Sequence, residues 1–560
     1  MQRYGQAPVY IINTNAERTS GRQAQLSNVA AAKAVADVIR TTLGPRAMLK
    51  LILDAMGGVV ITSDGNAILR EIDVGHPAAK AMIDLARTQD EEVGDGTTSV
   101  IVLAGSLLAA AEPCLEGGVH PTVIVGAYMR ALEDALEVLD RRCARPVDAQ
   151  DDAVLRQLVH TCVGTKIMDV HRELITQLVI DAVRLVSQVA KGTTPQSREV
   201  DIKHNIRIEK VPGGELSGSR VLRGVLLNKD VLHPQMRRRI EQPRVVLLDC
   251  PLEYKKGESQ ASVEVTNEQD WDQLLRLEEE YVQQLCNQVI AVKPDVVITE
   301  KGVSDLAAHF LAKANITALR RVRRTDNQRV ALATGARIVS RPEELQAADV
   351  GTGAGLYEVR KLGDEYFSFL EECREPRACT ILLRGGSKDV LNEVERNLHD
   401  ALAVARNVLR DPRLVAGGGA AEMTLRQGLL ERAGAIEGAA QLPYRAVAQA
   451  LEVIPRTLAE NCGASVIRVM TRLRALHAQS SDPPMGVDGI TGEVANMAEL
   501  GVFESYAVKA QSIKTAIESA CMLLRIDDVL SGVRKKDGAG GAQESGGFDR
   551  SGEDAGNEVG

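Results

Sequence analysis

The segment 294–320 constrains the fold most, because its pattern predicts a strand, a helix and a second strand in direct succession. Residues 296–298 are an apolar run typical of a buried strand, and Ser304 is placed to cap a helix over 305–313. Residues 316–319 again have the pattern of a strand. Because two strands joined through a helix are normally parallel, the centre of the chain should hold a partly parallel α/β sheet.

Both ends of the chain have a different, helical pattern. Apolar residues recur three to five positions apart within 20–150, and helical periodicity returns over 387–409 and 419–526. A chain of 560 residues should divide into three or four domains of about 150 residues each. We therefore expect an α/β domain inserted between two helical ends that together form one body.

The composition changes near the C-terminus. Residues 537–560 contain eight glycines, six acidic residues and one arginine, which gives a net charge of −5. Such a segment buries too little apolar surface to offset the entropy lost on ordering it. It should be a flexible acidic tail.

Charge and cysteine content limit the possible partners. The formal net charge is −9 and the arginine clusters at 237–239 and 320–324 are short, which argues against nucleic acid. The longest uncharged stretch, 96–111, has 16 residues, fewer than the roughly 18 to 20 that span a bilayer, so no membrane is expected. Nine cysteines without a C-x-x-C pair are typical of a reduced, cytoplasmic protein, and Cys373 and Cys379 are interpreted as free thiols.

Four glycine-rich turns are the motifs that could carry chemistry. The turn 94–99, with the sequence GDGTTS, precedes a long apolar helix whose free N–H groups would attract phosphate. Its Asp95 could hold Mg²⁺. The other turns are 43–45, 64–66 and 417–419. Any one of them alone is more often a turn between helices than a phosphate site, and the chain has no Walker A sequence.

Together and in this order, these motifs resemble those of group II chaperonins, the family of the eukaryotic cytosolic chaperonin. The resemblance can be followed from about residue 19 to residue 528. The stretches that carry it are Leu43-Gly44-Pro45 with Met48 and Lys50, TSDGNAI at 62–68, GDGTTS at 94–99, ILLRGG at 381–386, VAGGGAAE at 415–422 and LRIDD at 524–528.

The resemblance implies a multidomain fold of α and α/β domains. Both chain ends would form a helical equatorial domain, an intermediate domain would act as a hinge, and an inserted α/β apical domain would carry a helical lid. The implied boundaries are 1–150 (equatorial), 151–220 (intermediate), 221–376 (apical), 377–410 (intermediate), 411–530 (equatorial) and 531–560 (flexible acidic, glycine-rich tail).

The resemblance also implies an ATPase that uses Mg²⁺. Asp64 and Asp400 would be catalytic, placing and activating the attacking water, and Asp95 would coordinate Mg²⁺. Lys166 would sense the γ-phosphate from the intermediate domain. The other residues that the resemblance assigns to ATP are Leu43, Gly44, Pro45, Gly65, Gly96, Thr97, Thr98 and Ser99 near the phosphates, and Gly418, Asp488, Gly489 and Glu504 near the nucleoside.

The pattern around Asp400 predicts its surroundings independently. On the helix 387–409, Asp400 falls with Glu393, Arg396 and Asn397 on a polar face, so periodicity predicts a solvated acid. The opposite, apolar stripe consists of Leu391, Val394, Leu398, Ala401, Leu402 and Ala405. An acid on an exposed hinge-domain face reaches the γ-phosphate only when the domain swings onto the nucleotide, so hydrolysis should be gated by closure.

The lid is expected within 251–287, where the family has its insertion. The polar residues 258–270 should form its exposed tip. Apolar residues then recur with helical spacing, and we interpret them as an anchor that packs a helix onto the apical sheet. These residues are Trp271, Leu274, Leu275, Tyr281, Val282 and Leu285.

The function implied by the resemblance is that of an ATP-dependent molecular chaperone subunit. The implied partners are paralogous subunits in two stacked eight-membered rings, and unfolded clients such as actin and tubulin. Retention of Asp64, Asp95 and Asp400 favours this hypothesis.

A second hypothesis is an assembly and client-binding subunit that holds nucleotide structurally and hydrolyses little of it. It is favoured by residues that differ from the family's common pattern near the nucleotide, namely Val163, Gly164, Met485, Asn496 and Ser505. A third hypothesis, an unrelated ATP-dependent enzyme, would need a separate small-molecule pocket, for which the sequence has no candidate.

Overall fold

The structure is a computed structural model of the chain. It describes residues 17–53, 57–148, 151–166, 170–187, 201–254, 268–479 and 483–531. The predicted tail 531–560 lies outside the described residues except for its first residue, and so does most of the predicted lid tip, 258–267.

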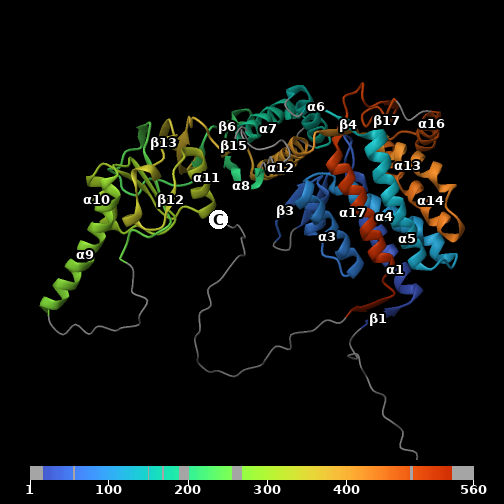
Figure 1. The fold of residues 1–560 in the computed structure, drawn as a ribbon, viewed down its shortest axis with the longest axis horizontal. Helices are drawn as coiled ribbons and strands as arrows, with labels where there is room; N and C mark the ends of the chain where they lie inside the picture. The colour runs from blue at the N-terminus through green and yellow to red at the C-terminus, as the bar shows by residue number, and fades with distance from the viewer. Residues whose placement is uncertain are drawn as a thin grey trace, which may run out of the picture.

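The described residues form three bodies in a row along the long axis (Figure 1). The terminal body consists of residues 17–146 and 413–531, the middle body of 152–222 and 379–410, and the inserted body of 225–371. The chain passes from the terminal body through the middle body to the inserted body and returns by the same route. This order matches the predicted insertion, whereas the domain boundaries themselves stay a prediction.

The terminal body is mostly helical. Its first segment contributes α1 (Arg22–Ile39), α2 (Gly65–Glu71), α3 (Pro77–Val93), α4 (Thr97–Glu116), α5 (Pro121–Val138), β1 (Glu17–Ser20), β2 (Lys50–Leu53), β3 (Val59–Thr62) and β4 (Arg145–Pro146). Its second segment contributes α13 (Ala420–Ala433), α14 (Gln441–Ala450), α15 (Val453–Asn461), α16 (Val466–Gln479), α17 (Tyr506–Leu524), β16 (Arg413–Ala416), β17 (Met485–Val487), β18 (Val494–Asn496), β19 (Phe503–Ser505) and β20 (Asp528–Ser531). Strands β1 and β20 pair, as do β4 and β16, so the two segments share sheets.

Helix α4 is the centre of the terminal body. It is the one helix among the described residues that is long and apolar enough to cross a membrane. Here it is packed between α1, α3, α14 and α17. Its side chains Ile101, Leu107 and Leu108 are fully buried. Helix α4 is therefore the core helix of this body.

The middle body joins the other two. It contains α6 (Asp152–Val163), α7 (Arg172–Ser187), α8 (Ile202–Asn205), α12 (Lys388–Arg410), β5 (Ile206–Pro212), β6 (Arg220–Leu222) and β15 (Cys379–Gly385). Strand β15 lies between β5 and β6, and helices α7 and α12 bury their apolar sides in one core with this sheet. Helix α6 and the second half of α12 also pack on Leu414 of the terminal body.

The inserted body is built on two four-stranded sheets. Its elements are α9 (Glu268–Ala291), α10 (Asp305–Lys313), α11 (Arg324–Thr334), β7 (Val225–Leu227), β8 (Arg239–Glu241), β9 (Val245–Leu248), β10 (Val296–Thr299), β11 (Thr317–Leu319), β12 (Ile338–Val339), β13 (Leu356–Leu362) and β14 (Glu365–Glu371). One sheet, in the order β11-β10-β9-β12, is parallel, and the other, β7-β14-β13-β8, is antiparallel. The predicted strand–helix–strand unit is confirmed, and Ser304 Oγ accepts the N–H of Ala307 at 3.1 Å as the predicted cap.

The interpretation of α9 as an anchor along its whole apolar stripe is wrong. Only its second half packs on the inserted body, through Val282 and Leu285. Trp271, Leu275 and Tyr281 have 53%, 46% and 43% of their surface exposed. The first half of α9 projects from the body (Figure 1). Helical spacing shows that one face is apolar, but it does not show whether that face has a partner in the same chain.

Candidate functional site

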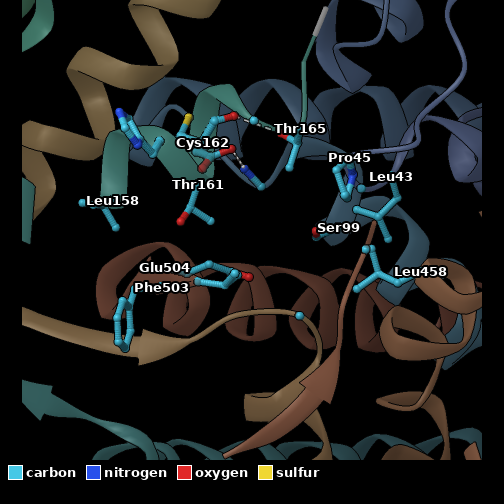
Figure 2. Close-up of a pocket in the computed structure, with 18 of the residues that line it drawn as sticks. Leu43, Pro45, Ser99, Leu158, Thr161, Cys162, Thr165, Leu458, Phe503 and Glu504 are labelled. Atoms are coloured by element: carbon cyan, nitrogen blue, oxygen red, sulfur yellow. Dashed lines mark hydrogen bonds between the residues drawn. The ribbon is translucent and has the colours of Figure 1, made fainter. Parts of the chain in front are cut away.

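A cavity of about 710 Å³ lies where the middle body meets the terminal body. Figure 2 shows Thr161 and Cys162 of α6 on one side, with Phe503 and Glu504 of β19 opposite. Of the predicted site residues, fifteen line this cavity: Leu43, Gly44, Pro45, Asp64, Asp95, Gly96, Thr97, Thr98, Ser99, Lys166, Asp400, Gly418, Asp488, Gly489 and Glu504. The chain therefore brings together residues that are up to 461 positions apart in the sequence.

The remaining predicted residue, Gly65, packs directly behind the cavity wall. A Cβ atom at Gly65 would lie 2.8 Å from Thr98 Oγ1 and 3.1 Å from the Thr98 nitrogen. A glycine is thus needed for the first turn of α2 to approach the start of α4.

The turn 94–99 forms the N-terminus of α4 and one wall of the cavity. Gly94 and Gly96 have φ values of 68° and 76°, a left-handed conformation that glycine adopts without strain. No side chain caps the N–H groups at the start of this 20-residue helix. These free donors, together with the helix dipole, favour an anion at this position.

Two aspartates stand beside this helix terminus. Asp95 Oδ1 accepts the N–H of Gly96 at 2.7 Å, which fixes its carboxylate at the cavity wall. Asp64 caps α2 by accepting the N–H of Ala67 at 3.0 Å, and its other oxygen accepts Thr97 Oγ1 at 3.1 Å. Both carboxylates are thus held by short local bonds.

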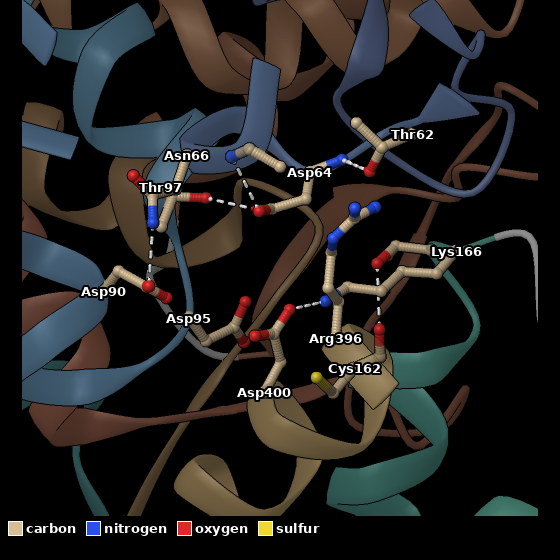
Figure 3. A network of polar contacts seen from close by, with 12 residues as sticks. Thr62, Asp64, Asn66, Asp90, Asp95, Thr97, Cys162, Lys166, Arg396 and Asp400 are labelled. Atoms are coloured by element: carbon tan, nitrogen blue, oxygen red, sulfur yellow. Dashed lines mark hydrogen bonds and ion pairs between the residues drawn. The ribbon is translucent and has the colours of Figure 1, made fainter. Parts of the chain in front are cut away.

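A third carboxylate, Asp90, lies close to this pair and was missed by sequence reasoning. Its Oδ2 accepts the Asn66 Nδ2 at 2.8 Å, as Figure 3 shows. Burial, and then the charge of Asp64, raise the pKa of Asp90 above its ordinary value. Only its position, one helical turn before the glycine turn, could have indicated that Asp90 belongs to the site. In the helical pattern of α3, however, Asp90 does not differ from the other acidic residues.

Lys166 and Asp400 form an ion pair across the cavity from the glycine turn (Figure 3). The lysine follows α6 and the aspartate lies on α12, so both come from the middle body. Burial lowers the pKa of Lys166, but Cys162, Asp95 and Asp64 outweigh this effect and raise it overall. The lysine therefore stays positively charged beside these carboxylates.

The predicted solvated face of α12 is wrong. Glu393 is 4% exposed, Asn397 is fully buried and the Asp400 side chain is only 15% exposed. The face is covered because α12 crosses the junction and contacts α3, β3 and α6. Helical periodicity correctly separates polar from apolar residues, but a polar face can also be buried against another polar surface.

The other end of the cavity is bounded by the loops 417–419 and 486–489 and by Glu504. Gly418 has a φ of 62°, and a Cβ atom there would lie 2.9 Å from the carbonyl oxygen of Val487. Asp488 accepts the N–H of Ile490 at 2.9 Å and the hydroxyl of Thr491 at 2.6 Å. These close contacts hold the loops tightly around the cavity.

A buried cation, Lys509, was also missed by sequence reasoning. Its Nζ lies 2.6 Å from both Glu422 and Glu504. Burial raises the pKa of Glu504, and the nearby Lys509 opposes this shift. The sequence offers no signal for this triad. Glu422 lies 87 positions before Lys509, and Lys509 sits on a helix with an ordinary pattern.

The donor set fits Mg²⁺ only together with phosphate. Among the residues that the structure describes, no group of three or more His, Cys, Asp or Glu side chains is arranged to hold a metal ion. Mg²⁺ bound to a nucleotide usually takes one or two carboxylates and completes its shell with phosphate oxygens and water. Asp95, fixed beside the uncapped helix terminus, matches that requirement.

Comparison with known proteins agrees with this architecture. The family model described as the TCP-1/cpn60 chaperonin family matches residues 35–534. The chain is 60% identical over 530 residues to T-complex protein 1 subunit gamma of Schizosaccharomyces pombe, covering 95% of this chain and 99% of that protein. It is 57% identical to the subunits of that name from Homo sapiens, over 532 residues, and Saccharomyces cerevisiae, over 536, with 95% of this chain and 97% and 100% of those proteins covered.

Three further stretches resemble gamma-type subunits in particular, namely RTQDEEV at 87–93, TEKGVSDL at 299–306 and CREPRACT at 373–380. The relatives confirm this resemblance, because they carry that subunit name. The family match covers most of the chain and includes all of the residues that line the cavity. The chain belongs to the TCP-1/cpn60 chaperonin family.

Proposed function

We propose that this chaperonin chain is a gamma-type subunit that binds ATP and Mg²⁺ in the 710 Å³ cavity and couples hydrolysis to closure around an unfolded protein. One observation carries the proposal. Asp400 and Lys166 of the middle body face Asp64 and Asp95 of the terminal body across a single cavity. A catalytic set divided between two bodies works only when those bodies are together, and so it links chemistry to domain movement.

The proposed reaction is an in-line attack of water on the γ-phosphorus. The water oxygen bonds to phosphorus, the bond to the bridging oxygen of ADP breaks, and the proton of the water passes to Asp400. Asp64 holds the water, and the N–H groups at the start of α4 hold the phosphate oxygens. Mg²⁺, when bound at Asp95, supplies neutralisation of phosphate charge.

The Lys166–Asp400 ion pair gives this reaction a built-in order. In the structure Lys166 occupies the carboxylate that must accept a proton. An arriving terminal phosphate is a competing anion for the ammonium group. Transfer of Lys166 to the phosphate frees Asp400 to act as the base, so hydrolysis starts only after the phosphate is in place.

Assembly is supported by an exposed apolar surface on the terminal body, formed by one face of the hairpin β2–β3. Leu51 and Leu53 lie opposite Ile61 and Val59, so all four side chains share one face. Their exposed fractions are 68%, 67%, 45% and 50%. An apolar hairpin face of this kind is typical of a contact with another chain. We assign it to neighbouring, paralogous subunits in one of two stacked eight-membered rings.

The clients and location proposed for this chain follow from the family resemblance. The clients would be unfolded proteins such as actin and tubulin, and the compartment would be the cytosol. All nine cysteines are free in the structure, including the buried Cys373 and Cys379, which is compatible with a reducing compartment.

The alternative, a subunit with structurally bound nucleotide, keeps one observation in its favour. Ser505, one of the positions that differ from the common pattern, has a buried hydroxyl without a hydrogen-bond partner among the described residues. It follows Glu504 directly at the start of α17. Single-turnover hydrolysis of ATP by the purified full-length chain separates the two: turnover supports the ATPase, whereas tight ATP binding without turnover supports the alternative.

Asp95→Asn should weaken the binding of Mg·ATP by about tenfold or more, because it removes the charge that attracts Mg²⁺ and keeps the acceptor for Gly96. Titration calorimetry with and without Mg²⁺ measures this. Binding of Mg²⁺-free ATP should be unchanged or slightly tighter in the variant. If the unaltered chain and Asp95→Asn bind Mg·ATP with equal affinity, Asp95 is not a ligand of Mg²⁺.

A further inference from the structure

We propose that Arg396 is a second phosphate-binding cation of this site, which stabilises the negative charge that develops on the terminal phosphate during hydrolysis. The inference rests on the ATPase function proposed above. It assigns a transition-state role to a residue that the sequence pattern placed on a solvated face.

The position of Arg396 comes from the geometry of α12. It precedes Asp400 by four residues, and side chains with this spacing lie on the same side of a helix. Figure 3 shows the Arg396 side chain beside Lys166, with its guanidinium group toward Asp64. Helix α12 also contacts β3, the strand that ends two residues before Asp64. Arg396 is not itself among the residues that line the cavity, whereas Lys166 and Asp64, toward which its side chain lies in Figure 3, both line it.

A buried carboxylate holds Arg396 at this position. Its Nη1 donates to Glu393 Oε2 at 2.7 Å, and Glu393 is 4% exposed. The other oxygen of Glu393 is buried and has no hydrogen-bond partner among the described residues. Burying an incompletely bonded carboxylate on a helix is costly, so a surface role does not explain it. The buried carboxylate of Glu393 is explained if it orients a guanidinium group that must act nearby.

The guanidinium group keeps donors available for a ligand. It has five N–H donors, and the described contacts use one of them, to Glu393. About a third of the side chain, 32%, is exposed. The fork of remaining N–H groups matches phosphate oxygens in geometry and charge.

The charge balance of the cavity calls for a second cation. Asp64, Asp90, Asp95 and Asp400 cluster at the phosphate end, and Lys166 is already paired with Asp400. Arg172 also lines the cavity, but it has an interaction partner of its own. ATP adds further negative charge, which in the transition state is spread over the oxygens of the transferred phosphoryl group and the leaving oxygen. An arginine supplied from the same chain lowers the energy of that state.

Arg396 takes no proton in this step. The proton of the water still passes to Asp400, and the electron pair of the broken bond stays on the ADP oxygen. Arg396 donates hydrogen bonds to the oxygens of the transferred phosphoryl group. Such a contact is stronger in the transition state than with bound ATP, so its loss should affect turnover more than affinity.

The test uses the full-length chain with Arg396→Gln and Arg396→Lys. Arg396→Gln should slow single-turnover hydrolysis about 100-fold or more and change ATP affinity by less than about threefold. It should also lose about 30-fold or more in affinity for ADP with aluminium fluoride, a transition-state mimic. Arg396→Lys should recover only part of the rate, because lysine lacks the planar fork.

Two further variants control for folding and charge. Glu393→Gln keeps the side-chain volume, removes the anchoring charge, and should slow hydrolysis about tenfold with ATP affinity unchanged. Arg410→Gln, in the exposed last turn of the same helix, should behave as the unaltered chain.

The outcomes are distinct. If Arg396→Gln hydrolyses ATP and binds the ADP–aluminium fluoride mimic as the unaltered chain does, the inference is overturned. Equal losses of affinity for ADP, ATP and the mimic would overturn it as well, because they indicate a structural role. Failure of the proposed function looks different: the unaltered chain would then show no hydrolysis that depends on Asp400.

Discussion

Replacing Asp400 with alanine is expected to stop ATP hydrolysis by this chain and to leave ATP binding nearly intact. In the proposed mechanism Asp400 accepts the proton of the attacking water, and a positioned general base contributes about 10²- to 10⁴-fold to a rate. The residues proposed to surround the phosphates lie mainly on the terminal body, at the start of α4, and the substitution leaves them unchanged. Removing the partner of Lys166 also releases that lysine for the phosphate.

Single-turnover hydrolysis and equilibrium ATP binding measure the two effects separately. Asp389→Asn is a matched control, because Asp389 lies in the exposed first turn of the same helix. It should leave both quantities unchanged. Hydrolysis by Asp400→Ala at the rate of the unaltered chain would show that another group activates the water.

A charge on the apolar face of the hairpin β2–β3 is expected to abolish assembly. Leu51→Lys places an ammonium group in the centre of the face formed with Leu53, Val59 and Ile61. Burying an unpaired charge in an interface costs several kcal/mol, which exceeds what a modest contact contributes. The folded monomer should be unaffected, because Leu51 is already 68% exposed.

Size-exclusion chromatography with light scattering measures the assembly, and circular dichroism checks the fold. Val390→Lys is a suitable control, because Val390 is an exposed apolar residue, 43% exposed, on the middle body. It should leave assembly intact. Rings that form normally with Leu51→Lys would place the subunit contact elsewhere.

The local elements of this fold could be predicted from the sequence. The strand–helix–strand unit is confirmed, and the helix predicted over 387–409 is found at Lys388–Arg410. Both have strong short-range signals, namely a buried apolar run, a serine cap and a regular apolar stripe. Such signals depend on neighbours in sequence, and so they survive without knowledge of the tertiary fold.

The tertiary neighbours that cover each face of a helix could not be predicted. The polar face of α12 is buried because it crosses the junction, and the apolar stripe of α9 is exposed where the helix projects from its body. Asp90 and Lys509 belong to the site through contacts with residues outside their own helices, and the sequence patterns of those helices do not indicate these contacts. The glycine turns and aspartates of the site were found only because their motifs, taken together, resemble a known family.

Native mass spectrometry of the complex that contains the full-length chain tests the central claim most directly. The account predicts a particle of about one megadalton, which is two rings of eight subunits close to this chain's 60.3 kDa, with paralogous subunits beside it. A stable 60.3 kDa monomer that hydrolyses ATP by itself would contradict the account.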